Sequence, residues 1–255
     1  MNILLSFDVE EFDLPLEFSQ KIKEQDMFEF SKQGLLKILN ILDKHKIKAT
    51  FFTTASFAQK YPELIKKISQ THEIASHGLS HSLNKHTEQQ IQKSKQILES
   101  ITGKTINGFR APRLQKPDFQ LLNKLNFKYD SSISPTYIPG RYNNYKEKRS
   151  ITMKKGIVEI PISTLPVLRL PLAWLFFRTF PLAYSKIITI LNKNLNFTNL
   201  YLHPWEFNSL NNFKIPRYIK TNSGDKALKK LERYIIWCRK KNYIFTTFEE
   251  FLKSS

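Results

Sequence analysis

The chain has 255 residues, of which 41% are hydrophobic and 24% charged, so it can bury a large core and is not typical of a disordered protein. Its single cysteine, Cys238, excludes an internal disulfide. The net charge of +18 would attract anionic partners, but the lysines are spread along amphipathic segments with no dense basic tract, so we expect a solvated Lys-rich surface and no nucleic-acid partner.

Short β-rich runs alternate with longer amphipathic segments along the whole chain. The predicted strands are 2–9, 48–53, 72–76, 107–111, 127–131, 157–162, 199–203 and 243–247. The predicted helices lie around 35–42, 57–68, 87–100, from Pro117 onward, 172–194 with an interruption at Pro181, 226–240, and at the C-terminus. Thr87 and Gln90 predict a capping box, and residues 134–150 predict a loop. This alternation is typical of a parallel α/β fold.

The N-terminal sequence lacks the basic region and long apolar run of an export signal, so the expected location is cytoplasmic. The most hydrophobic stretch, 165–191, is interrupted by three prolines and two arginines and predicts no membrane span. Within it, 165–180 is interpreted mainly as core. The alternative is a flap beside the functional site, or a surface for a membrane or a lipid-linked sugar.

Functional side chains of a parallel α/β fold gather at the C-terminal ends of its strands. Asp8 and Glu10 follow the first strand and point to one side of it, because side chains alternate along a strand. A cation would relieve their mutual repulsion, but taken alone the stretch is more simply explained as a solvated acidic loop. His77 and His81 follow the third strand, and their i, i+4 spacing on a helical turn predicts a shared metal. His45, His72 and His86 have no such partner and are interpreted as structural or surface residues.

Two further strand ends carry polar residues. Arg110, in Arg110-Ala111-Pro112, can orient a carboxylate, and Asp130 at the end of the next strand is one candidate for it. His203 ends a later strand, where it is either a core residue or a general acid.

Taken in order, these stretches resemble the polysaccharide deacetylase family (carbohydrate esterase family 4, the NodB homology domain). The motifs that carry the resemblance are Ser6-Phe7-Asp8-Val9-Glu10, His77-Gly78-Leu79-Ser80-His81, Arg110-Ala111-Pro112, the segment 127–132, and Leu202-His203. The similarity spans residues 3 to about 207. It implies a distorted (β/α)7–8 barrel in a single domain, 1–255, with a hydrophobic insertion at about 163–195.

Two positions depart from the family pattern. Gly78 stands where a Ser or Thr is usual, and Val9 stands where the family has an aspartate that binds metal. An Asp-x-Glu spacing, together with Tyr201-Leu202-His203-Pro204-Trp205-Glu206-Phe207, resembles the branch found with exopolysaccharide biosynthesis. The ligand role therefore moves to Glu10, with Glu11 and Asp13 as weaker alternatives.

The resemblance implies a divalent metal held by Glu10, His77 and His81. Zinc suits such a site best, and Co²⁺, Ni²⁺ or Fe²⁺ would also fit. By the same resemblance Asp8 is the general base, His203 the general acid, and Arg110 holds Asp8 or Asp130 in place. The substrate contacts it implies are Pro112, Tyr137, Leu202 and Trp205, with a backbone N–H near Tyr137 facing the oxyanion.

The expected activity is removal of N-acetyl groups from amino sugars of a polysaccharide or lipid-linked glycan, with peripheral membrane contact as an open alternative. A cyclic amide or imide hydrolase resembling allantoinase would use the same fold. A non-haem Fe(II) oxygenase uses similar ligands, but usually on a β-sandwich. A non-catalytic glycan- or nucleic-acid-binding module is the last alternative, prompted by the charge alone.

Overall fold

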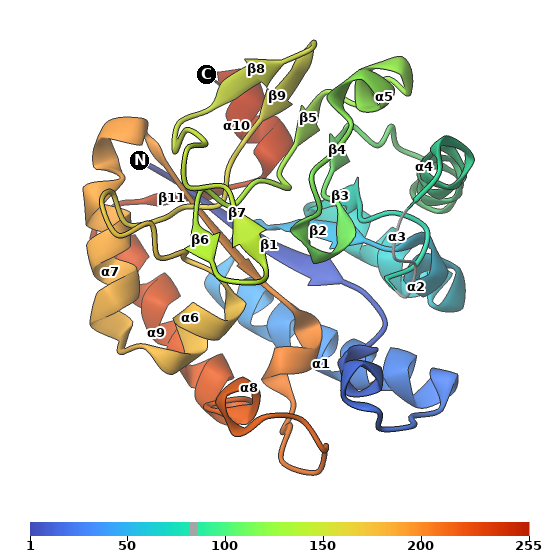
Figure 1. Cartoon of the computed structure of the whole chain (residues 1–255), viewed down its shortest axis with the longest axis horizontal. Helices are drawn as coiled ribbons and strands as arrows, with labels where there is room; N and C mark the ends of the chain where they lie inside the picture. Colours follow the sequence, from blue (N-terminus) through green and yellow to red (C-terminus); the bar gives the residue numbers. More distant parts are fainter. Residues whose placement is uncertain (82–85, 255) are drawn as a thin grey trace.

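The computed structural model describes residues 1–81 and 86–254, which form one curled sheet with helices packed around it (Figure 1). Within these residues the sheet has nine strands, in the order β10-β1-β2-β3-β4-β5-β9-β8, with β11 paired to β1. The strands are β1 (Asn2–Val9), β2 (Thr50–Thr53), β3 (Glu73–Ser76), β4 (Gly108–Phe109), β5 (Tyr129–Asp130), β8 (Thr152–Lys154), β9 (Ile157–Glu159), β10 (Phe197–Leu202) and β11 (Ile244–Thr246). All pairs are parallel except β8–β9. The mixed α/β, half-barrel architecture confirms the predicted fold class.

Strand β1 pairs with β10, β2 and β11, and its alternate side chains point to opposite faces of the sheet. Ile3, Leu5, Phe7 and Val9 join the large core between the sheet and the helices. Leu4 instead packs in a second core inside the curl. Because Asp8 has the same parity as Leu4, the strand carries its carboxylate to the inner side, at the C-terminal end.

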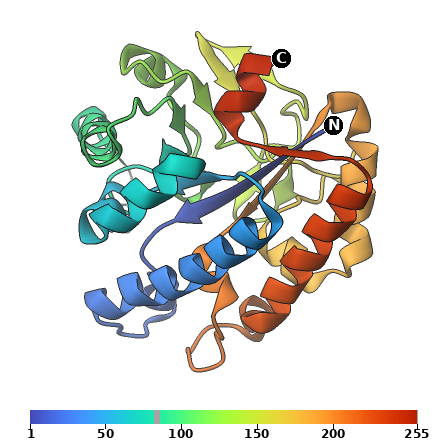
Figure 2. The ribbon, with the colours of Figure 1, turned by 180° about the vertical axis from the view of Figure 1, so that it is seen from behind.

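Most helices cover the outer side of the sheet, where α1 and α9 lie side by side (Figures 1 and 2). The C-terminal helix α10 instead contributes Phe248 and Phe251 to the core inside the curl. Their bounds are α1 (Glu24–His45), α2 (Ala55–Lys60), α3 (Pro62–Thr71), α4 (Glu88–Thr102), α5 (Phe119–Lys124), α6 (Trp174–Thr179), α7 (Leu182–Leu191), α8 (Arg217–Lys220), α9 (Asp225–Lys240) and α10 (Phe248–Ser254). The predicted capping box of Thr87 and Gln90 opens α4. The predicted helix 57–68 is instead two helices, because Pro62 starts a new one. Likewise Asp118, not Pro117, caps α5.

Short 3₁₀ turns complete the strand ends: η1 (Leu14–Phe18), η2 (Pro112–Leu114), η3 (Lys193–Leu195) and η4 (Pro204–Phe207). The predicted loop 134–150 contains a small hairpin, β6 (Tyr137–Ile138) with β7 (Tyr142–Asn143). After β9 the chain returns to β10, where Ser163 N donates to Asn199 O at 3.1 Å. This contact draws the two sides of the curl together.

The hydrophobic stretch forms α6 and α7, separated by Pro181 as the sequence predicts. None of the helices in the described ranges is long and apolar enough to cross a bilayer. The boundaries of a hydrophobic insertion at 163–195 stay a prediction.

Candidate metal centre

Three predicted ligands converge beyond the C-terminal ends of β1 and β3. One ligand atom each from Glu10, His77 and His81 lies within 4.8 Å of the other two, and all three residues are buried. The Nε2 atoms of His77 and His81 lie 3.2 Å and 3.3 Å from the same oxygen, Oε2 of Glu10. A carboxylate and two imidazoles gathered this closely form a donor set suited to a divalent cation.

The remaining ring nitrogens fix the orientation of both imidazoles. Nδ1 of His77 lies 2.8 Å from the carbonyl oxygen of Arg110, and Nδ1 of His81 lies 2.8 Å from Oδ1 of Asp13. Because a carbonyl and a carboxylate only accept, each Nδ1 carries a proton, so that either ring in its neutral form presents its Nε2 lone pair to the centre. Trp205 Nε1 donates to the other Glu10 oxygen at 3.2 Å. The residues present therefore fit a metal in both identity and tautomer.

The histidine pair reaches this point through a loop, which corrects the prediction of a helical turn. Residues 77–81 follow β3 without helical structure, and Gly78 has φ +78°. Glu11 holds the loop from behind by accepting from His81 N at 2.7 Å and from the Ser80 hydroxyl. Of the three carboxylates considered as ligands, Glu11 thus holds the loop, Asp13 orients His81, and Glu10 lies between the imidazoles.

The charged groups of the centre shift the pKa values of Glu10 and His81 in opposite directions. Burial by itself would raise the pKa of Glu10, but His81, His203 and His77 together hold it well below its usual range. Burial likewise opposes charge on His81, yet the Glu10 and Asp13 carboxylates raise its pKa to about 9. In the protein without metal, one positive charge is thus favoured where a cation would bind.

Asp8 lies beside this centre and is held by Arg110. Arg110 Nη1 donates to Asp8 Oδ1 at 2.6 Å, and Asp8 Oδ2 lies 3.9 Å from His77 Nε2. The fully buried guanidinium also donates to Ser131 O at 2.9 Å and lies 3.9 Å from the Phe52 ring centroid. One Asp8 oxygen is therefore fixed by a charge-assisted hydrogen bond, and the other faces the centre.

His203 follows the last residue of β10 and is held in place by two buried charged residues, Glu206 and Arg178. Its Nδ1 lies 3.1 Å from Glu206 Oε1, and its Nε2 lies 3.9 Å from Glu10 Oε1. Glu206 is bound in turn by Arg178 Nε at 2.5 Å. The Glu206 carboxylate fixes the His203 tautomer, so Nε2 faces the pocket and can carry a proton to a substrate.

A small pocket of about 40 Å³ opens over these groups. Six of the residues predicted for the site line it: Asp8, Glu10, His77, His81, His203 and Trp205. The others in the lining are Asp13, Leu14, Glu17, Arg113, Leu114, Arg141, Tyr142, Trp174 and Tyr201. Its size suits a group such as an acetamide rather than a whole sugar.

Asp130 does not line this pocket, and of the two partners expected for Arg110, Asp8 and Asp130, the structure gives Asp8. Its carboxylate accepts from Ser132 N and Oγ at 2.9 Å and 2.7 Å, and it shares a fully buried position with Glu159. Burial raises the pKa of both carboxyl groups, as expected when two acids lie together away from water. Arg110 pairs with Asp8 instead.

Three predicted substrate contacts also lie outside the pocket lining. Leu202 is fully buried in the outer core, Pro112 is buried at the start of η2, and Tyr137 is 56% exposed on the hairpin. The sequence analysis assigned no role to Glu206 or Arg113. Glu206 could have been predicted, because it lies three residues after His203, at the end of a predicted strand. Trp174 belongs to the stretch 165–180, which is interpreted mainly as core, and its place in the pocket lining agrees with the alternative of a flap beside the site.

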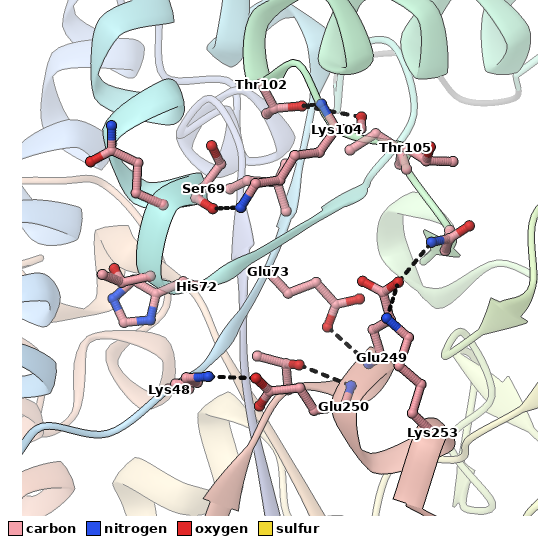
Figure 3. Close-up of a pocket in the computed structure, with 16 residues that line it drawn as sticks. Lys48, Ser69, His72, Glu73, Thr102, Lys104, Thr105, Glu249, Glu250 and Lys253 are labelled. Carbon is pink, nitrogen blue, oxygen red and sulfur yellow. Dashed lines mark hydrogen bonds and ion pairs between the residues drawn. The ribbon is translucent and has the colours of Figure 1, made fainter.

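A larger polar cavity of about 520 Å³ lies at the other end of β3 (Figure 3). Glu73, at the start of that strand, accepts from Tyr129 Oη at 2.7 Å and from Thr50 Oγ1 at 2.7 Å. Burial raises the pKa of Glu73 to about 7. None of the predicted site residues lines this cavity, so we assign the chemistry to the smaller pocket.

Comparison with known families divides the chain into two matched parts. Residues 26–129 match the polysaccharide deacetylase family model, and residues 131–253 match a domain of unknown function, DUF3473. The first part contains His77, His81 and Arg110, and the second contains His203. Asp8 and Glu10 precede both.

Named relatives agree with the first match. Over 121 residues the chain is 32% identical to the peptidoglycan-N-acetylmuramic acid deacetylase PdaA of Bacillus subtilis, covering 44% of this chain and 46% of that protein. Over 108 residues it is 31% identical to a peptidoglycan deacetylase of Helicobacter pylori, covering 39% and 37%. These findings support the polysaccharide deacetylase family. The matches span less than half of either relative.

Solved structures of low identity share the polysaccharide deacetylase fold. A protein described as a probable polysaccharide deacetylase from Pseudomonas aeruginosa PAO1 superposes with a TM-score of 0.69 at 15% identity, covering 98% of this chain and 88% of that one. The Puue allantoinase superposes with a TM-score of 0.67 at 17% identity and the same coverage. At such identities the likeness establishes the fold alone.

Proposed function

We propose that this chain is a metal-dependent hydrolase that removes N-acetyl groups from amino sugars of a glycan. The observation that carries the proposal is the convergence of Glu10, His77 and His81 beside a carboxylate and a third histidine, all lining one small pocket. The polysaccharide deacetylase match and the named relatives support the substrate class. Glu10, His77 and His81 would hold a divalent cation, which would supply Lewis-acid polarisation of the acetamide carbonyl.

The chain's own residues supply the proton transfers. Asp8, with Oδ1 fixed by Arg110, accepts the proton of an attacking water through Oδ2. The water oxygen bonds to the acetyl carbon, and the C–N bond breaks. Protonated His203, oriented by Glu206, gives its Nε2 proton to the departing amine. The products are acetate and a free amino sugar.

Finer features of the proposal rest on the ligand set and the motifs. Zinc is the proposed metal, because two imidazoles and one carboxylate with room for further ligands are typical of catalytic zinc sites. The Asp8-Val9-Glu10 spacing supports assignment to the branch associated with exopolysaccharide biosynthesis. A cytoplasmic location and a polymeric or lipid-linked glycan substrate are part of the same proposal.

The test compares three variants of the zinc-loaded protein. Asp8→Asn should lower acetate release from N-acetylglucosamine oligomers by at least about 100-fold while retaining one metal per chain, since general-base catalysis typically contributes 10²–10⁴. His77→Ala should lose the metal by elemental analysis. Asp26→Asn, at an exposed position in α1, is the matched control and should change neither. Full activity in Asp8→Asn, or ring opening of cyclic imides without acetate release, would contradict the proposal.

A further inference from the structure

A second cavity, of about 330 Å³, adjoins the metal pocket and shares five lining residues with it. The shared residues are Leu114, Arg141, Tyr142, Trp174 and Tyr201. Its lining residues come in large part from the β6–β7 hairpin and from α6. The metal pocket accommodates little more than an acetamide, so the adjoining cavity is where the rest of a substrate has room.

The walls of this cavity suit the face of a sugar ring. Trp174 stands edge-on to both His203 and Trp205, with ring centroids 5.5 Å apart in each case. Tyr201 lies beside His203 at 5.3 Å. Tyr142 anchors the hairpin by donating its hydroxyl to Arg113 O at 3.2 Å. These side chains are held by packing, so the aromatic surface is formed before any ligand arrives.

Two side chains in the lining, Arg141 and Ser134, have polar atoms that could form further hydrogen bonds with a ligand. Arg141 Nε donates to Tyr142 Oη at 3.2 Å, and across the described residues no hydrogen bond or ion pair engages its two terminal nitrogens. The Ser134 hydroxyl is buried and, within the same residues, has no hydrogen-bond partner. Among the described residues, no aspartate or glutamate lines this cavity. Glu17 of the adjoining metal pocket acts on Arg141 through its charge, but its ion pair is with Arg113. A guanidinium with free donors beside a cavity that holds no carboxylate selects an anion.

We infer that this cavity is a subsite for an acidic sugar unit, next to the N-acetylated unit whose acetamide enters the metal pocket. The sugar ring would lie against Tyr142 and Trp174, and its carboxylate would pair with the terminal nitrogens of Arg141. The net charge of +18 acts in the same direction, since it concentrates polyanions near the protein. This inference rests on the proposed function and narrows it to anionic glycans.

The test uses two probes of equal length: the N-acetylglucosamine tetramer, and a tetrasaccharide alternating N-acetylglucosamine with N-acetylmuramic acid, which carries carboxylates. Binding to zinc-loaded protein is measured by calorimetry, together with acetate release. We expect the acidic probe to bind at least about ten-fold more tightly, because it adds a charge-assisted hydrogen bond that the neutral tetramer cannot form. Arg141→Gln should remove this ratio, whereas Arg233→Gln, an exposed arginine on α9, should retain it.

Equal affinity for the two probes, or a ratio unchanged in Arg141→Gln, would overturn the inference. Failure of the proposed function looks different. If neither probe releases acetate but the Arg141-dependent ratio is present, the subsite stands and the deacetylase proposal falls. If both probes release acetate with no preference, the deacetylase proposal stands and the acidic subsite falls.

Discussion

Gly78 shows how one residue determines whether the histidine pair can meet. Its φ of +78° lies in the region that disfavours side chains, and an added Cβ would lie 2.7 Å from His86 Nε2. That His86 nitrogen accepts from Ser80 N at 3.4 Å, inside the loop that carries His77 and His81. A hydroxyl-bearing residue at this position would therefore disturb the loop, which gives the departure from the family pattern a physical reason.

We predict that Gly78→Ala weakens zinc binding by roughly ten-fold, as expected when the support of a metal ligand is displaced. Gly103→Ala is the matched control, because Gly103 has φ +67° but nothing within 4 Å of an added Cβ. It should cost about 1 kcal/mol of stability from backbone strain and leave zinc affinity unchanged. Competition titration with a chelating dye measures both affinities. Equal affinity of the two variants would show that crowding against His86 has no influence on the centre.

The prediction of the site was most accurate for residues whose side-chain direction is set by a strand. Parity along β1 brings Asp8 to the inner side, and the ends of parallel strands bring His77 and Arg110 beside it. Strand direction does not predict which of two nearby residues a side chain pairs with. Both Asp8 and Asp130 were possible partners of Arg110. Only the packed structure shows that Arg110 pairs with Asp8, while Asp130 interacts with Ser132 and Glu159.

Among the secondary-structure elements, the long strands were predictable from the sequence and the short strands were not. The apolar runs of β1 and β10 are long and were found within two residues of their bounds. The hairpin β6–β7 and the antiparallel β8 are two or three residues each, too short for a periodic signal. The hairpin lines the cavity beside the metal centre, so the features of that cavity were the least predictable from the sequence.

Helix α6 is joined to η4 and α8 by one buried guanidinium. Arg178 binds Glu206 through Nε and donates to Thr221 O at 2.9 Å and Ile219 O at 2.8 Å. Both members of the ion pair are fully buried. The same contact therefore fixes α6, which supplies Trp174, and η4, which supplies Glu206 to orient His203.

We predict that Glu206→Gln lowers the free energy of unfolding by about 3 kcal/mol, because it leaves the Arg178 charge buried without a counter-ion. Glu232→Gln is the control: Glu232 pairs with Lys44 and His45 at the surface, and its loss should cost under about 1 kcal/mol. Urea unfolding of metal-free protein measures both. Similar losses in the two variants would mean that the Arg178–Glu206 pair does not hold these elements together.

At the scale of the whole molecule, the two ends of the sheet carry buried carboxyl groups of opposite character. At the C-terminal ends, imidazoles hold the pKa of Glu10 low, so it is ionised and able to bind a cation. At the N-terminal ends, burial holds the pKa of Glu73 at about 7 (Figure 3). Strand β3 connects them, since it begins at Glu73 and ends one residue before His77. Ionisation of Glu73 is therefore unfavourable at one end of the sheet, whereas ionised Glu10 is favoured at the other end.

The raised pKa of Glu73 predicts how stability changes with pH. In the unfolded chain Glu73 loses its proton near pH 4.5, whereas in the folded protein it keeps it to about pH 7. Between these values the folded state binds more protons, so the contribution of Glu73 to stability falls as pH rises, by about 3 kcal/mol in total. We therefore expect the difference in unfolding free energy between wild type and Glu73→Gln to shift by that amount between about pH 4.5 and 7.5, in favour of the variant.

Urea unfolding of metal-free protein across this range tests it, with Glu63→Gln on α3 as a control that should show no shift. A pH-independent difference for Glu73→Gln would mean that its hydrogen bonds from Tyr129 and Thr50 keep the carboxylate ionised despite burial.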